Sequence, residues 1–145
     1  MVRWATLVLL LLLGCTDLRE FRGTWDGHRV GDAPALHTGI SGTTSQLIID
    51  HIDGHSFAAR LAVDGLFPAT PISSIPGAEA DVLSDITFTG DPLKVYLSFV
   101  PVPDAHGDGL LVIALFDDRR IEVRLIRGGG FPLYGIWSMT PAAAP

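Results

Sequence analysis

The stretch LIIDHIDGHSFAARLAV, residues 47–63, decides the fold class of this chain. Two apolar segments, LIIDHI and SFAARLAV, lie on either side of Asp53-Gly54 in its middle. Aspartate followed by glycine between two such segments is the strongest short-range signal of a β-hairpin. We therefore predict two antiparallel strands joined by a tight turn.

The rest of the chain repeats this pattern of short alternating segments separated by turn residues. In LKVYLSFV (93–100), Val95, Leu97 and Phe99 share one face, and the nearly all-apolar GLLVIALF (109–116) is typical of a central strand. Together the patterns predict eight or nine strands, at residues 24–30, 36–40, 47–52, 56–63, 85–89, 93–100, 109–116, 119–127 and 133–139.

Successive hairpins with short loops favour an antiparallel meander. We expect an all-β fold of about eight strands, a small closed or partly open barrel, with a β-sandwich as the alternative. The barrel is preferred because closure removes exposed strand edges. A membrane-spanning barrel would need strands of about 9–11 residues with aromatic girdles, and the segments here look shorter. Trp137 is expected opposite the first strand, since the first and last strands of a closing meander pair.

One connection is expected to be long. Residues 64–81, DGLFPATPISSIPGAEAD, contain three prolines, and loops of this length in compact domains are often lids or binding loops. A surface loop without a role is the alternative. Residues 78–84 are expected to form at most one or two helical turns.

The N-terminus carries a different pattern, in which an apolar run ends on the only cysteine of the chain. Arg3 precedes a leucine-rich run, residues 5–13, that is too short for a transmembrane helix, which needs about 20 apolar residues. The run fits the apolar region of a secretory signal peptide. It closes on Leu12-Leu13-Gly14-Cys15, which resembles the lipobox of bacterial lipoproteins.

The resemblance to bacterial lipoproteins implies an address and an anchor. In that family the chain is cleaved before the cysteine, which carries fatty acyl chains such as palmitate. Two or three chains on Cys15 would hold the protein on a membrane, because each buried methylene contributes about 0.8 kcal/mol. Thr16, rather than an aspartate, follows the cysteine, which implies the outer membrane of a Gram-negative cell envelope. An ordinary signal peptide followed by an inert cysteine is the alternative.

The same junction divides the chain into four expected parts. Residues 1–14 are the signal peptide, residues 15–22 the lipidated cysteine and a short tether, residues 23–140 a single β-domain, and residues 141–145 a flexible tail. Removal of the signal peptide leaves 131 of the 145 residues, enough for one domain with a core. Only Arg3 leaves with it, so the formal net charge goes from −6 to −7, which argues against nucleic acid as a partner.

The segment HIDGH, residues 51–55, has the alternating His51, Asp53 and His55 of a metal site. A two-residue turn at Asp53-Gly54 would pair Ile52 with His55, and it would pair His51 with Ser56. The two histidines would then point to opposite faces and form no chelate. We therefore predict a hairpin here rather than a metal site.

Two other motif candidates lack residue types that their chemistry needs. DAHGDG, residues 104–109, begins like a calcium-binding loop, but the twelfth position is Leu115 instead of glutamate. GISGT, residues 39–43, lacks the second glycine of a nucleophile elbow. Ser73-Ser74 has no histidine or acid nearby in the sequence. We expect no catalytic residue, no metal, no cofactor and no enzymatic activity.

FRGTW, residues 21–25, resembles the Gly-x-Trp motif on the first strand of lipocalins and avidin-like barrels, and Gly23 and Trp25 carry the match. The resemblance implies that Trp25 closes one end of the barrel. It also implies that an arginine from late in the chain, Arg127 or Arg124, packs over this ring. Trp25 and Arg127 are therefore the candidate ligand-binding residues. A core tryptophan near a strand start is the alternative.

These patterns support three hypotheses for function. The first is a lipid-anchored envelope lipoprotein that serves as a binding or accessory module for an envelope protein partner. The second is a lipocalin-like carrier of a small apolar ligand, and the third is an unrecognised hydrolase. The carrier comes second because bulky side chains are available to fill the interior: Phe57, Leu61, Phe88, Leu97, Phe99 and Leu115.

Overall fold

The computed structural model describes residues 17–30, 42–76, 88, 90–102, 107–130 and 132–143. Within these residues the chain forms a short 3-10 helix and eight strands, which confirms the expected all-β fold. The elements are η1 (Leu18–Phe21), β1 (Gly23–Arg29), β2 (Thr44–Ile52), β3 (Phe57–Val63), β4 (Phe67–Ser73), β5 (Lys94–Pro101), β6 (Asp108–Leu115), β7 (Ile121–Arg127) and β8 (Leu133–Pro141).

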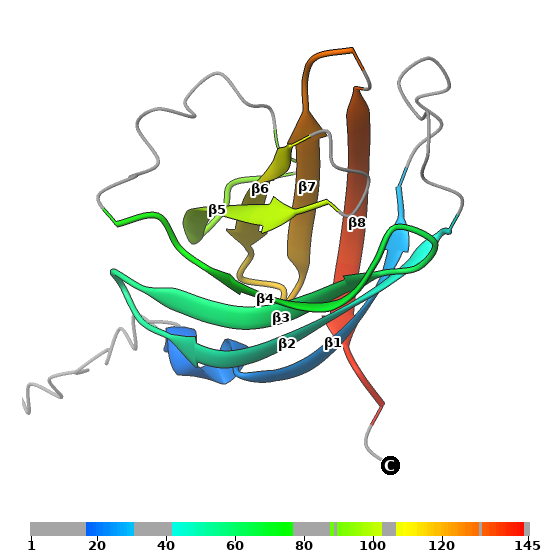
Figure 1. The fold of residues 1–145 in the computed structure, drawn as a ribbon. Helices are drawn as coiled ribbons and strands as arrows, with labels where there is room; N and C mark the ends of the chain where they lie inside the picture. Colours follow the sequence, from blue (N-terminus) through cyan, green and yellow to red (C-terminus); the bar gives the residue numbers. More distant parts are fainter. Residues whose placement is uncertain are drawn as a thin grey trace, which may run out of the picture.

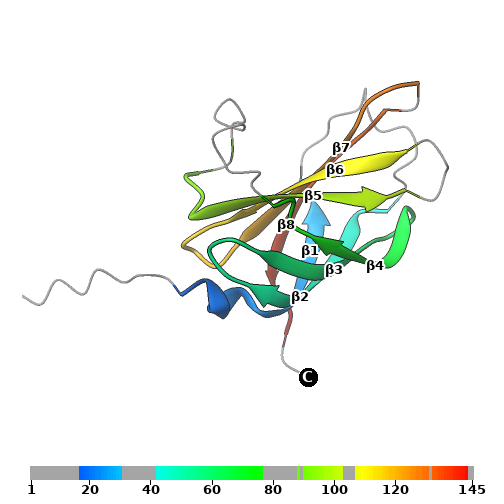
Figure 2. The same cartoon turned by 60° about the vertical axis from the view of Figure 1, so that its left-hand side comes forward.

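The strands form one antiparallel sheet in the order β4-β3-β2-β1-β8-β7-β6-β5. The first and last strands pair as expected, from Trp25 opposite Pro141 to Arg29 opposite Trp137. The sheet curls so that β1–β4 form one half and β5–β8 the other (Figures 1 and 2). The result is a nearly closed barrel, and its open seam lies between β4 and β5.

Serine residues bridge one end of this seam. Ser74 and Ser98 form an isolated antiparallel β-bridge. The N–H of Ile75 donates to the carbonyl of Leu97 (2.8 Å), and Oγ of the buried Ser98 donates to the carbonyl of Ser73 (2.7 Å). These bonds attach β5 to the chain that follows β4, so the barrel is held together here without a full ladder.

The prediction of a long loop over residues 64–81 is wrong for its first half, because Phe67–Ser73 forms β4. Pro68 and Pro71 made this segment look like a loop, since proline cannot donate to a ladder. β4 pairs with β3 on one side only, and proline is tolerated on such an edge strand. The turn between β3 and β4 is short, with Gly65 at φ 72°.

The loop between β2 and β3 is longer than the two-residue turn that we predicted. Ile52 pairs with Phe57 instead of His55, so four residues form the loop. The Asp53 carboxylate accepts hydrogen bonds from the backbone N–H groups of His55 (2.8 Å) and Ser56 (2.7 Å). Aspartate commonly stabilises turns through such local bonds, and here they hold a wider turn than Asp-Gly alone would take.

The barrel interior is filled by buried apolar side chains from both halves of the sheet. Three of the residues expected to fill it do so, namely Phe57, Leu61 and Leu115. The largest side chains in this core are Trp25, Trp137, Phe21 and Phe57.

A second apolar cluster covers the outer face of β5 and β6. Leu97 and Phe88, which we expected inside, belong to this cluster, and Phe99 is 55% exposed. The inner face of β5 carries Tyr96 and Val100 instead. Both faces of β5 are therefore apolar, and strict alternation does not say which face meets the core.

Several expected features lie outside the described residues. They are the strand at 36–40, most of the strand at 85–89, the helical turns at 78–84, the start of the 104–109 loop, and Cys15 with the segment before it.

Gly135 on β8 leaves space for the Trp137 ring. Even the small side chain of alanine at this position is therefore predicted to reduce stability. A Cβ atom at Gly135 would lie 2.7 Å from Cζ3 of the fully buried Trp137. We expect Gly135→Ala to lower the free energy of unfolding by about 1–3 kcal/mol, because the ring has no room to move away. Urea denaturation measures the change. Gly128→Ala is the control, since a Cβ there meets nothing within 4 Å. Equal stability of the two variants would contradict the tight packing of Trp137.

Candidate functional site

The β2–β3 loop brings together His51, Asp53 and Ser56. Nε2 of His51 lies 3.0 Å from Oδ2 of Asp53 and 3.0 Å from Oγ of Ser56. A catalytic triad places the acid on one ring nitrogen and the nucleophile on the other. Here the same nitrogen faces both groups, and the side chains of His51 and Asp53 are each 47% exposed. The arrangement therefore does not activate Ser56 for nucleophilic attack.

The loop does not assemble a metal site either. His55 takes part through its backbone N–H, which donates to Asp53. Among the residues that the structure describes, no group of three His, Cys, Asp or Glu side chains could hold a metal ion. Nothing in the described part of the chain indicates an enzymatic activity.

Tyr96 attaches this loop to β5. Its hydroxyl donates to the backbone carbonyl of Asp53, and its ring stacks on Phe57 with 5.2 Å between centroids. Burial, and to a smaller extent the Asp53 charge, raises the pKa of Tyr96 to about 12, so the hydroxyl stays protonated and able to donate. Because Phe57 begins β3 and Tyr96 lies on β5, the stacked rings cross the open seam. The polar loop therefore supports the barrel.

The Asp53 carboxylate makes the stability of the protein depend on pH. The N–H groups of His55 and Ser56 hold the pKa of Asp53 well below its usual range, and the side chains of His51 and Ser56 add to the effect. A carboxylate whose pKa is lower in the folded state stabilises the fold above its unfolded pKa of about 3.9 and loses that contribution as the pH falls. We expect the free energy of unfolding to decrease steadily below about pH 4.

Asp53→Asn tests this expectation, because asparagine still accepts the two backbone hydrogen bonds but carries no charge. The stability difference between the parent and Asp53→Asn should shrink as urea denaturation is repeated at successively lower pH. Ser56→Ala is the matched control, since the backbone N–H bonds remain and only part of the pH dependence should be lost. A constant difference at every pH would show that the Asp53 charge does not stabilise the fold.

The two candidate ligand-binding residues, Trp25 and Arg127, lie toward opposite ends of the barrel. Trp25 is opposite Pro141 at the last position of β8, and Arg127 is opposite Leu133 at the first. At about 3.3 Å per residue, most of the length of β8 separates these levels. Phe21 covers Trp25: the rings are 5.6 Å apart, and Nε1 of Trp25 donates to the Phe21 carbonyl (2.8 Å).

The arginine stacking implied by the lipocalin resemblance is therefore not formed on Trp25 by Arg127. Arg124 lies over another ring, with its Cζ 4.9 Å from the centroid of Phe88. Arg127 is on the core side of β7, as its position in the alternation indicates, and it is buried. Binding of a ligand by Trp25 or Arg127 stays a prediction, and one ligand that touched both would have to extend along much of the barrel.

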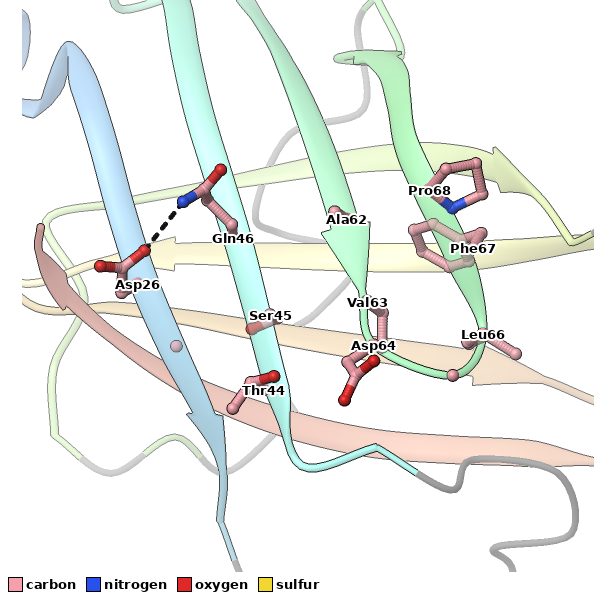
Figure 3. Close-up of a pocket in the computed structure, with 12 residues that line it drawn as sticks. Asp26, Thr44, Ser45, Gln46, Ala62, Val63, Asp64, Leu66, Phe67 and Pro68 are labelled. Carbon is pink, nitrogen blue, oxygen red and sulfur yellow. Dashed lines mark hydrogen bonds between the residues drawn. The ribbon is translucent and has the colours of Figure 1, made fainter.

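A hollow of about 760 Å³ opens over β1–β4, at the end of the barrel that carries the β3–β4 turn (Figure 3). Its apolar wall comes from β3, the turn and the start of β4. Its polar residues come from β1, β2 and the same turn: Asp26, Thr44, Ser45, Gln46 and Asp64.

Sequence reasoning missed this hollow, because its residues come from four strands that no short motif connects. One signal did point toward it. Residues 64–81 are the candidate binding loop of the sequence, and five of them, residues 64–68, line the hollow. The length of the segment was misjudged, whereas its first residues do contribute to a cavity.

We compared the chain with known proteins. No family model matches it, and neither a curated protein nor a solved structure gives a significant match. Among the described residues, no helix is long and apolar enough to cross a membrane.

Proposed function

We propose that this chain is a lipid-anchored protein of a bacterial cell envelope, in the outer membrane, whose barrel serves as a non-enzymatic binding or accessory module. The observation that carries the proposal is the position of its only cysteine. Cys15 ends an apolar run in a lipobox-like sequence and precedes the first described residue, Asp17, by two positions. A lipid on Cys15 would therefore be attached directly beside the folded domain.

Contacts of η1 support a short tether. The segment 15–22 was expected to link the lipid to the barrel, yet Leu18–Phe21 forms η1 within it. Phe21 is buried and Leu18 packs against the core, so η1 belongs to the domain. Three residue steps separate Cys15 from Leu18, which span at most about 11 Å. The barrel would therefore be held at the membrane surface, with the η1 end nearest the lipid.

The filled interior favours a binding or accessory role over that of a carrier. Trp25, Trp137 and Phe57 are buried in the interior with other apolar side chains, and a small barrel whose interior is filled by side chains differs from one that encloses a ligand. An accessory protein needs a surface for its partner instead. Phe99 on β5, beside the seam, is the most exposed of the large apolar side chains in the described part of the chain, and a partner could cover it.

Mass spectrometry of the mature protein, extracted from its own membranes in mild detergent, tests the anchor. We expect a chain that begins at Cys15 and carries the mass of two or three acyl chains. Cys15→Ser should remove the acyl mass and abolish retention in the membrane fraction, because no other thiol exists to accept the lipid. An unmodified chain that begins elsewhere would overturn the lipoprotein proposal. A small apolar molecule that stays bound under gentle activation would favour the carrier instead.

A further inference from the structure

We propose that the hollow over β1–β4 binds a small organic cation, an ammonium or guanidinium group with a short apolar body. The inference rests on the proposed function, because it names a ligand class for the binding module. It does not require a lipid on Cys15. Three properties of the hollow support it: its charge, its fixed polar groups and its apolar wall.

The charge of the hollow is negative. Asp26 and Asp64 contribute two carboxylates, and none of the twelve residues that line the hollow is a lysine, arginine or histidine. Oδ1 of Asp26 accepts a hydrogen bond from Nε2 of Gln46 (3.1 Å), which is a neutral donor. The ion pairs within the described ranges involve other carboxylates, those of Asp50, Asp53, Asp118 and Glu122. A cationic group is the complement that this surface lacks.

Both aspartates are attached to a neighbouring strand, Asp26 through its carboxylate and Asp64 through its backbone. The N–H of Asp64 donates to the carbonyl of Thr44 (3.0 Å), which attaches the start of the turn to β2. Gly42 lies directly against the Asp64 backbone, where a Cβ atom would collide with the Asp64 carbonyl. Asp26 lies on β1 opposite Gln46, which holds its carboxylate. Groups that are fixed before binding cost less free energy to order around a ligand.

The wall beside these carboxylates is apolar. Its accessible part comes from Leu66 on the turn and Pro68 on β4, which lie beside the almost fully buried Val63 and Phe67 (Figure 3). The volume of about 760 Å³ lies within the range of about 300–1,000 Å³ that is typical of small-molecule pockets. A bare inorganic cation would leave this wall unused, so the ligand that fits best combines a positive group with an apolar part.

The position of the hollow suits a ligand from solution. In Figures 1 and 2 the β3–β4 turn and η1 lie at opposite ends of the β1–β4 half. A lipid on Cys15 would place the η1 end at the membrane, and the hollow would then open away from it.

Titration calorimetry with benzylammonium on the full chain in mild neutral detergent tests the inference. We expect saturable binding that weakens with added salt, and about fivefold weaker binding for Asp26→Asn or Asp64→Asn, the size of one partly exposed charge contact. Asp91→Asn is the matched control, because it removes an exposed carboxylate outside the hollow. Benzyl alcohol and benzoate, which have the same ring without a positive charge, should show no saturable binding.

Three results would overturn the inference. They are the absence of saturable benzylammonium binding, equal binding of benzyl alcohol, and unchanged affinity when both aspartates are replaced in variants that keep the parent melting temperature. None of these results bears on the lipid anchor, which is tested separately by the acyl mass and by Cys15→Ser. A protein that is acylated but does not bind the probe would leave the anchor standing and remove only the cation site.

Discussion

Trp25→Ala is expected to lower the free energy of unfolding by about 3–5 kcal/mol, the usual cost of truncating a buried Trp or Phe side chain. Trp25 is almost fully buried in the main core and stacks on Phe21. Its Nε1 donates to the Phe21 carbonyl, so the ring also holds η1 against β1. Because domains of this size are stable by only about 5–15 kcal/mol, urea denaturation should show a large shift of the midpoint.

Trp25→Phe separates packing from hydrogen bonding in this prediction. Phenylalanine keeps a ring beside Phe21 but has no N–H for its carbonyl, so we expect a smaller loss than for alanine. Hydrogen exchange gives a local test, because the N–H of Arg22 donates to the carbonyl of Arg19 within η1 and should exchange faster in Trp25→Ala. A cost below about 1 kcal/mol for Trp25→Ala would contradict the buried packing of this ring.

Glu122→Ala is expected to cost about 3 kcal/mol, because it removes the anion from a largely buried charge cluster. Glu122 is only 3% exposed, although it points to the outer face of β7. Its carboxylate lies 2.5 Å from Nε of Arg124 and 3.7 Å from Nη1 of Arg120. Both arginines also lie over aromatic rings. Cζ of Arg120 is 3.8 Å from the centroid of Phe116, and Cζ of Arg124 is 4.9 Å from the centroid of Phe88.

A paired substitution is the control for Glu122. Removing one partner leaves buried positive charge without its nearest anion, whereas replacing both partners by apolar groups is often neutral. We therefore expect Glu122→Leu combined with Arg124→Met to recover part of the stability lost in Glu122→Ala, as measured by chemical denaturation. Equal or greater loss in the paired variant would show that the charge interaction is not the reason for the cost.

Local sequence patterns predicted most of the strands because each strand alternates or is continuously apolar over its own length. The pairing of β1 with β8 also followed from the expectation of a closing meander. The failures share a cause. β4 was hidden by Pro68 and Pro71, and whether prolines are tolerated depends on the strand being at an edge, which is a property of the whole sheet.

The candidate sites were harder to predict than the strands. HIDGH invited comparison with a metal site, and the loop is instead organised by the hydrogen bonds of Asp53. The lipocalin resemblance placed an arginine over Trp25, and the ring that stacks on Trp25 is that of Phe21. In both cases the motif contains residues that do interact in the folded chain. Which of them meet depends on the conformation of the backbone, which the motif does not specify.

The sequence by itself determined the fold class, the approximate strand positions and the cysteine junction that suggests a lipid anchor, because these depend on residues close together in the chain. Only the tertiary structure decided where the barrel stays open, which face of β5 meets the core, and where a hollow forms. The physical reason is that these features arise between strands. The seam and the hollow join segments distant in sequence, and Phe88 packs against the apolar outer face of β5 and β6 although it belongs to neither strand.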